Sequence, residues 1–153
     1  MFNLSELVRG GTVCLSKTGL AVGSNTAKMK ILAPNGAGVD FAIKGVFYHI
    51  ADTDDICIFT AATQAALTTC LYLVTINSAN TILITKGTEV VTADLTAGKV
   101  ALTWPTPTAA YCPIGAVKVV ATAVFTAGAT ALGTGNAATY YDLFAVPDTP
   151  ITS

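Results

Sequence analysis

Apolar and polar residues alternate in short runs along most of the chain, and this period of two is typical of strands with one buried face. Val39, Phe41 and Ile43 alternate with charged or small residues, which predicts a half-buried strand. Gly45 interrupts the pattern, and Val46–Ile50 then resumes it. The two runs together predict a hairpin.

The clearest pair of predicted strands spans residues 70–76 and 81–86. Residues 77–80, with the sequence Asn-Ser-Ala-Asn, join them through a loop of common hairpin length. The other interior predictions are strands at 28–32, at 56–60 and from Val90, a loop or helical turn at 63–69, and a turn-rich link at 94–99.

Residues 111–144 form the stretch around which the rest of the chain is organised. It contains a long strand-like run at 114–125, a loop of small residues, and a second short strand at 139–144. Lys118 is its only basic residue and Asp142 its only acid, so it offers little for acid–base or nucleophilic chemistry. We expect it to form a sheet whose outward faces are covered in an assembly.

The number and spacing of these runs predict the fold class. About eight to ten short strands separated by turn residues, without a long helical pattern, are typical of a sandwich or barrel. We therefore predict an all-β, single-domain antiparallel β-sandwich or barrel that is jelly-roll-like. The predicted organisation is an N-terminal segment at 1–26 that forms a short arm or a helical turn, a β domain at 27–146, and a C-terminal tail at 147–153.

Composition adds an expectation about the surface. Hydrophobic residues make up 52% of the chain and charged residues 11%, with a net charge of −1. An ordinary soluble domain has about 25% charged residues, and so low a charge gives weak protection against association. A compact, uncharged globular protein is one interpretation. The other is that copies of the chain or a large partner cover much of the surface.

Charge and hydropathy also exclude classes of partner. The eight basic residues are scattered among nine acidic ones, so we expect no nucleic acid partner. Residues 56–85 carry no charge, but Gln64, Asn77 and Asn80 interrupt their apolar runs, so we expect no membrane-spanning helix and no membrane partner. Glu6 precedes any long apolar run, so the N-terminus does not resemble a secretory signal.

The four cysteines lack the spacing of a zinc site or a compact disulfide framework. We expect them to be small buried thiols, while the pair Cys57 and Cys70 could form a bridge. The four are Cys14, Cys57, Cys70 and Cys112.

Three patterns are reminiscent of functional sites and fail on context. Asp52, Asp54 and Asp55 resemble the start of a calcium loop, but the later ligand positions are not filled, so a solvated turn is predicted. His49 is the only histidine and has no nucleophile motif near it. Residues 133–138 match G-x-G-x-x-A but precede a predicted strand instead of a helix. We therefore expect no catalytic residue, no metal, no cofactor and no enzymatic activity.

Aromatic residues supply one candidate binding feature. Trp104, Tyr111, Tyr140 and Tyr141 could form an aromatic interface or a platform for a glycan. Aromatic residues in β-sandwiches more often fill cores or interfaces, so both interpretations stay open.

Six segments combine short strand-like runs with glycine or small residues. They are P-I-G-A-V-K-V at 113–119, F-T-A-G-A-T-A-L at 125–132, T-Y-Y-D-L at 139–143, G-L-A-V-G-S at 19–24, D-F-A-I-K-G-V-F-Y at 40–48 and T-I-L-I-T-K-G-T-E at 81–89. Together these segments resemble the small virion proteins of tailed bacteriophages, in particular the head decoration (cement) proteins.

This resemblance implies a structural protein that binds the outer surface of an assembled capsid and stabilises it. Its partners would be the major capsid protein and further copies of itself, with trimers a common arrangement. It would be made in the host cytoplasm and reside on the capsid surface of the virion. Leu4, Leu7, Val8 and Ile151 would be capsid or oligomer contacts. The alternative is a head-fibre or tail component that binds a host surface or a glycan.

Overall fold

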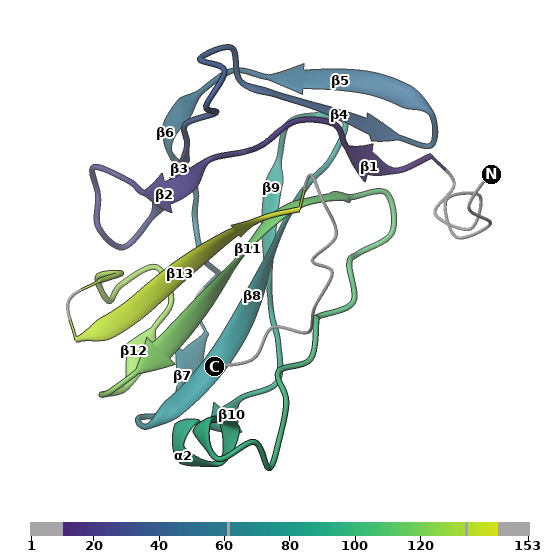
Figure 1. Ribbon diagram of the computed structural model, residues 1–153. Helices are drawn as coiled ribbons and strands as arrows, with labels where there is room; N and C mark the ends of the chain where they lie inside the picture. Colours follow the sequence, from purple (N-terminus) through teal and green to yellow (C-terminus); the bar gives the residue numbers. More distant parts are fainter. Residues whose placement is uncertain (1–10, 61, 134, 144–153) are drawn as a thin grey trace.

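The computed structural model describes residues 11–60, 62–133 and 135–143, which fold into antiparallel strands with one short helix (Figure 1). The strands are short in the first half of the chain and longest at β8 and β11. In chain order the elements are β1 Val13–Cys14, β2 Leu20–Val22, β3 Met29–Ile31, β4 Val39–Ile43, β5 Val46–Ile50, β6 Thr53–Cys57, β7 Thr63–Gln64, β8 Thr68–Ile76, β9 Ile82–Lys86, β10 Val90–Val91, α2 Thr92–Thr96, β11 Cys112–Ala121, β12 Phe125–Thr126 and β13 Asn136–Asp142.

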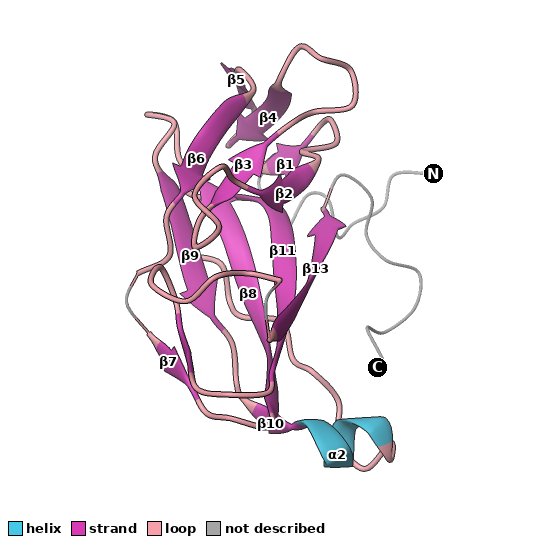
Figure 2. Cartoon of the chain, turned by 90° about the vertical axis from the view of Figure 1, so that its left-hand side faces the viewer, coloured by secondary structure: helices cyan, strands magenta, loops and turns pink. Residues whose placement is uncertain are grey.

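A five-stranded sheet is the largest unit of the fold. β8 and β11 lie at its centre, β13 pairs with the far side of β11, and both β9 and β10 pair with the far side of β8. The other sheets are β1-β4-β5, β2-β3-β6 and β12-β7. Figure 2 shows β2, β3 and β6 lying against one face of the large sheet. Packed antiparallel sheets confirm the all-β sandwich, and the described strands form no closed barrel.

The core lies between the large sheet and the smaller ones. Phe41 of β4 and Met29 of β3 pack there against alternate residues of β8 and β11. A bulge between Pro113 and Gly115 changes the alternation of β11, so that Ile114 and Val117 both point into the core. A Cβ on Gly115 would lie 2.3 Å from Leu20 Cδ1, so glycine permits β2 to approach β11 closely.

One buried polar network lies inside this apolar core. The Gln64 side chain is fully buried and donates hydrogen bonds to the carbonyl oxygens of Thr68 (3.0 Å) and Val119 (3.1 Å). The Tyr72 hydroxyl donates to Gln64 Oε1 (3.1 Å), and the Tyr72 ring meets Phe59 and Phe125 edge to face. The network satisfies polar groups that would be costly to bury alone.

Both predicted hairpins are confirmed. β4 pairs with β5 through Lys44 and Gly45, which both have positive φ as a two-residue hairpin turn requires. β8 pairs with β9 across residues 77–80. These elements depend on neighbours in sequence, which is why a local pattern predicts them.

Other local predictions need correction. Residues 94–99 were expected to be a turn-rich link, but α2 forms there because Leu95 is buried and Gly98, at φ 69°, ends the turn. The turn expected at 52–55 is largely strand β6, and β13 begins at Asn136 because that residue pairs with Ala121. Within the predicted arm at 1–26, β1 and β2 pair with β4 and β3, and the helical turn expected near the N-terminus lies outside the described residues.

Candidate functional site

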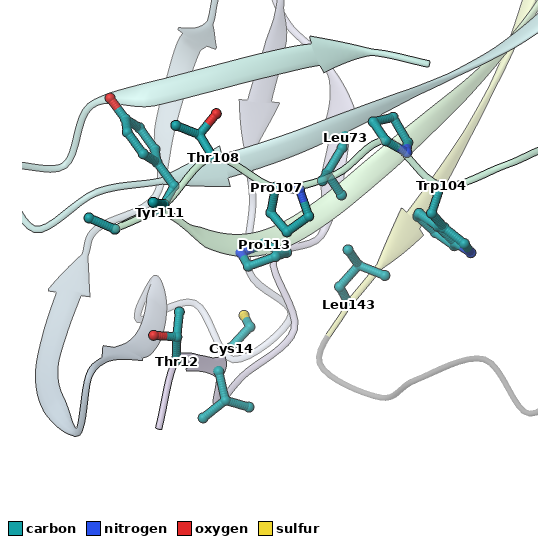
Figure 3. Close-up of a pocket in the computed structure, with 13 residues that line it drawn as sticks. Thr12, Cys14, Leu73, Trp104, Pro107, Thr108, Tyr111, Pro113 and Leu143 are labelled. Carbon is teal, nitrogen blue, oxygen red and sulfur yellow. The ribbon is translucent and has the colours of Figure 1, made fainter. Parts of the chain in front are cut away.

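A cavity of about 570 Å³ lies between β1, the start of β11 and residues 104–111 (Figure 3). Its described lining consists of apolar and hydroxyl-bearing residues and includes no charged side chain. Such a lining suits an uncharged, mainly apolar occupant. Prominent among its residues are Leu73, Trp104, Pro107, Tyr111, Pro113 and Leu143.

The sequence of the covering segment explains why the cavity forms. Pro105 and Pro107 have no N–H groups, so residues 104–111 cannot join the sheet as a central strand. The segment instead crosses the face of the sheet opposite the core, where Leu73 of β8 is buried outside the main cluster. A Cβ on Gly87 would lie 3.2 Å from Pro105 Cγ, so glycine leaves room for this crossing.

The structure brings two of the four predicted aromatic residues to the cavity. Trp104, 41% exposed, and Tyr111 line its opposite ends, with Pro107 and Pro113 between them (Figure 3). Asn77 Nδ2 donates a hydrogen bond to the Tyr111 hydroxyl (3.3 Å), which fixes Tyr111 against the β8–β9 turn.

The other predicted contact residues lie elsewhere. Tyr140 and Tyr141 are adjacent residues of β13, so their side chains point to opposite faces of the sheet. Tyr140 packs against the core, and neither residue lines the cavity. Leu4, Leu7, Val8 and Ile151 fall outside the residues that the structure describes.

Sequence reasoning missed an exposed apolar surface on the β1-β4-β5 sheet. Val13, Ala42 and Phe47 are cross-strand neighbours and therefore share one face, which points away from the core. Phe47 is 75% exposed on β5, and Val13 (42%) and Leu15 (39%) lie at β1, on the other side of β4. We call Val13, Leu15 and Phe47 the apolar outer face. Val13 also lines the cavity, so the two features are continuous.

His49 and the aspartates form hydrogen bonds within the fold. His49 Nδ1 lies 2.8 Å from Asp40 Oδ1, and both side chains are more than half exposed. Asp52 accepts the N–H of Ala33, while Asp54 and Asp55 accept N–H groups of the 24–25 loop. The hydrogen bond from the Ser24 hydroxyl lowers the pKa of Asp54 below its usual value. Within residues 11–60, 62–133 and 135–143, no three His, Cys, Asp or Glu side chains gather as metal ligands do.

All four cysteines are buried free thiols, as predicted, and the alternative Cys57–Cys70 bridge is not formed. Burial raises the pKa of Cys14 and Cys70 to about 11 and the pKa of Cys57 and Cys112 to about 12. At neutral pH these thiols are protonated, so they are poor nucleophiles.

Two further observations bear on the class of protein. Among the described residues, no helix has the length and apolar character needed to cross a membrane. Comparison with known proteins found no matching family model, no matching curated protein and no matching solved structure.

Proposed function

We propose that this chain is a structural virion protein that binds the outer surface of a bacteriophage capsid and stabilises it. In this proposal it is made in the host cytoplasm, associates with further copies of itself and with the major capsid protein, and has no catalytic role. The segments quoted above supply the resemblance to decoration proteins. The all-β sandwich and the low content of charged residues are compatible with that role.

The apolar outer face is the single observation that supports this proposal most strongly. Phe47 is 75% exposed on β5 and shares one face of the sheet with Val13 and Leu15, with Ala42 and Asp40 of β4 between them. Grouped exposed apolar residues interspersed with polar ones, here Asp40 and His49, mark surfaces that bind other proteins. A capsid repeats its binding site many times, so a modest contact of this kind can stabilise the assembled state.

The test compares two lysine substitutions on heads of the phage whose genome encodes the chain. Added protein is expected to raise the temperature at which the heads rupture. Phe47→Lys should weaken head binding at least about tenfold, because burying a charge in an apolar contact is costly. Val124→Lys, at a 61% exposed position on another surface, is the matched control and should bind normally.

Two results would reject the capsid proposal: absence of the protein from purified particles, and no change in rupture temperature on its addition. Equal binding by Phe47→Lys and Val124→Lys would instead show that binding does not use the apolar outer face.

A second function, glycan or host-surface binding by a head-fibre or tail component, is favoured by one observation. Trp104 and Tyr111 present aromatic surface to an open cavity, and aromatic rings often stack on sugars. However, the described lining offers hydroxyl groups and no carboxylate or side-chain amide to orient a sugar. A glycan panel probed with the protein and with Trp104→Ala tests this function. Binding that Trp104→Ala abolishes would favour it, and no binding would reject it.

A further inference from the structure

We infer that the free edge of β13 is a self-association strand, through which two copies of the chain pair antiparallel about a two-fold axis. This inference rests on the self-association in the proposed function and specifies the strand edge that mediates it. The observations that support it concern β13 and its immediate neighbours.

Hydrogen bonds at both ends of β13 show which of its backbone groups are free. Leu143 N donates to the Ile114 carbonyl and Thr122 N donates to the Gly135 carbonyl, both at 3.4 Å. Both pairs continue the register between β11 and β13. Because antiparallel bonding alternates along a strand, the odd-numbered residues of β13 bond to β11 and the even-numbered ones point outward.

The outward groups include the N–H and C=O of Ala138 and Tyr140. In the part of the chain that the structure describes, no strand pairs with this side of β13 and no hydrogen bond reaches these four groups. The Asp142 end is less open, because its carboxylate accepts the Gly19 N–H and lies 2.9 Å from the Thr18 hydroxyl. The accessible edge is therefore centred on Thr139. Figure 2 shows β13 as the outermost strand on its side of the large sheet.

This edge lacks the features that normally prevent strand pairing between molecules. Such features are an exposed lysine, a proline, or a bulge. β13 has none of them: its register with β11 is unbroken, and Asp142, its one charged residue, is held by β1–β2 groups. β9 on the opposite side of the sheet differs, because it ends in Lys86, whereas β9 and β13 both lie near a strand of the β2-β3-β6 sheet.

A second copy matches this edge well. With Thr139 on the two-fold axis, Ala138 would exchange hydrogen bonds with the partner's Tyr140, and Tyr140 with the partner's Ala138. Thr139 would face the partner's Thr139, and small Ala137 would face the partner's large Tyr141. The uncharged side chains cause no like-charge repulsion, and such a two-fold contact closes on itself.

A cysteine cross-link tests the register. Thr139 would be in a non-hydrogen-bonded pair with Cα atoms about 4.5 Å apart, a separation that a disulfide can span. Thr139→Cys should therefore form covalent dimers under mild oxidation, while the buried native thiols stay reduced. Ser78→Cys, exposed on the β8–β9 turn, is the matched control and should not cross-link beyond the background of the unmodified protein.

Sedimentation of the full chain tests the bonding. Wild-type protein should dimerise with rising concentration. Ala138→Pro removes an outward N–H, and Thr139→Glu places like charges on the axis while facing its own Lys118 across the sheet. Both variants should sediment as monomers, with a dimer dissociation constant at least about tenfold higher than that of the wild type. Ala138→Pro loses a hydrogen bond between the strands, and Thr139→Glu adds a charge repulsion. Thermal melts confirm that each variant is folded.

A wild-type protein that stays monomeric, a dimer that persists in both variants, or a Thr139→Cys variant that cross-links no better than Ser78→Cys would overturn the inference. These measurements use no capsid. The β13 edge can therefore fail while head binding holds, and head binding can fail while the edge pairs.

Discussion

β8 and β13 flank the same strand, β11, and differ in almost everything else. Every residue of β8 after Thr68 is buried, whereas Asn136 is the only buried residue of β13. β8 has strand neighbours on both sides, the core on one face and residues 104–111 across the other. β13 has a strand neighbour on one side only, within the described residues.

The sequences of the two strands reflect this difference. β8 reads TTCLYLVTI, a nearly continuous apolar run of the kind found in strands buried on both faces. β13 reads NAATYYD, with small and polar residues that contribute little buried area. Of the two strands, β8 therefore contributes most of the buried area, while the outer edge of β13 has no strand partner among the described residues.

The largest difference in stability between the two strands is expected in one row of cross-strand neighbours, Leu71–Lys118–Thr139. Leu71→Ala, on the central strand, should lower the free energy of unfolding by about 2–5 kcal/mol, because it empties a fully buried site. Thr139→Ala, on the edge, should change it by less than about 0.5 kcal/mol. Urea unfolding at several protein concentrations separates folding from association. Equal losses at the two positions would show that the two strands do not differ as described.

A smaller effect is expected from the polar network that lies beneath β8 and has no counterpart on β13. Gln64→Leu removes a hydrogen-bond partner of the Tyr72 hydroxyl, of the buried Val119 carbonyl and of the partly buried Thr68 carbonyl. Orphaned buried polar groups of this kind cost about 1–3 kcal/mol.

The control for this prediction is a double-mutant cycle with Tyr72→Phe. Removing the hydroxyl as well should make the double variant less destabilised than the sum of the single variants, because one orphaned group disappears. Strictly additive losses would mean that Gln64 and Tyr72 act independently.

The parts of the fold that the sequence predicts are those formed by neighbouring residues. The Lys44–Gly45 turn and the 77–80 loop connect strands that pair at once, so alternation and turn residues are sufficient to find them. The pairing of β1 with β4 joins strands separated by more than twenty residues, and no local pattern specifies it.

The candidate site is harder to predict for a related reason. Trp104 and Tyr111 share a cavity because residues 104–111 cross the second face of the sheet, while Tyr140 and Tyr141 are divided by the alternation of β13. Phe47 is exposed because it lies on the face of β5 that points to solvent. Residues 46–48 are all apolar, so the sequence alone does not show which face of β5 is buried.

The smallest expected effect on stability concerns Glu89, whose carboxylate bonds to groups at the start of β8. Among the described residues, the start of β13 has no equivalent contact. Its carboxylate accepts hydrogen bonds from Lys86 Nζ and from the N–H of Ala65, and lies 3.5 Å from the Thr68 hydroxyl. The hydrogen bond from Lys86 is the largest cause that lowers the pKa of Glu89 in the folded protein. Its ionised form therefore favours folding. That contribution is complete above the unfolded pKa of about 4.3 and is lost as the pH falls through the lower folded value.

Urea midpoints measured from pH 6 down to pH 3 should therefore fall less steeply for Glu89→Gln than for the wild type. Asp94→Asn is the matched control, because the Asp94–Lys99 pair (3.3 Å) is more exposed and lies on α2, away from β8. Exposed ion pairs contribute about 0–1 kcal/mol, so this variant should keep the wild-type slope. If Glu89→Gln also keeps that slope, the carboxylate does not anchor the central strand, and burial alone must account for the difference between β8 and β13.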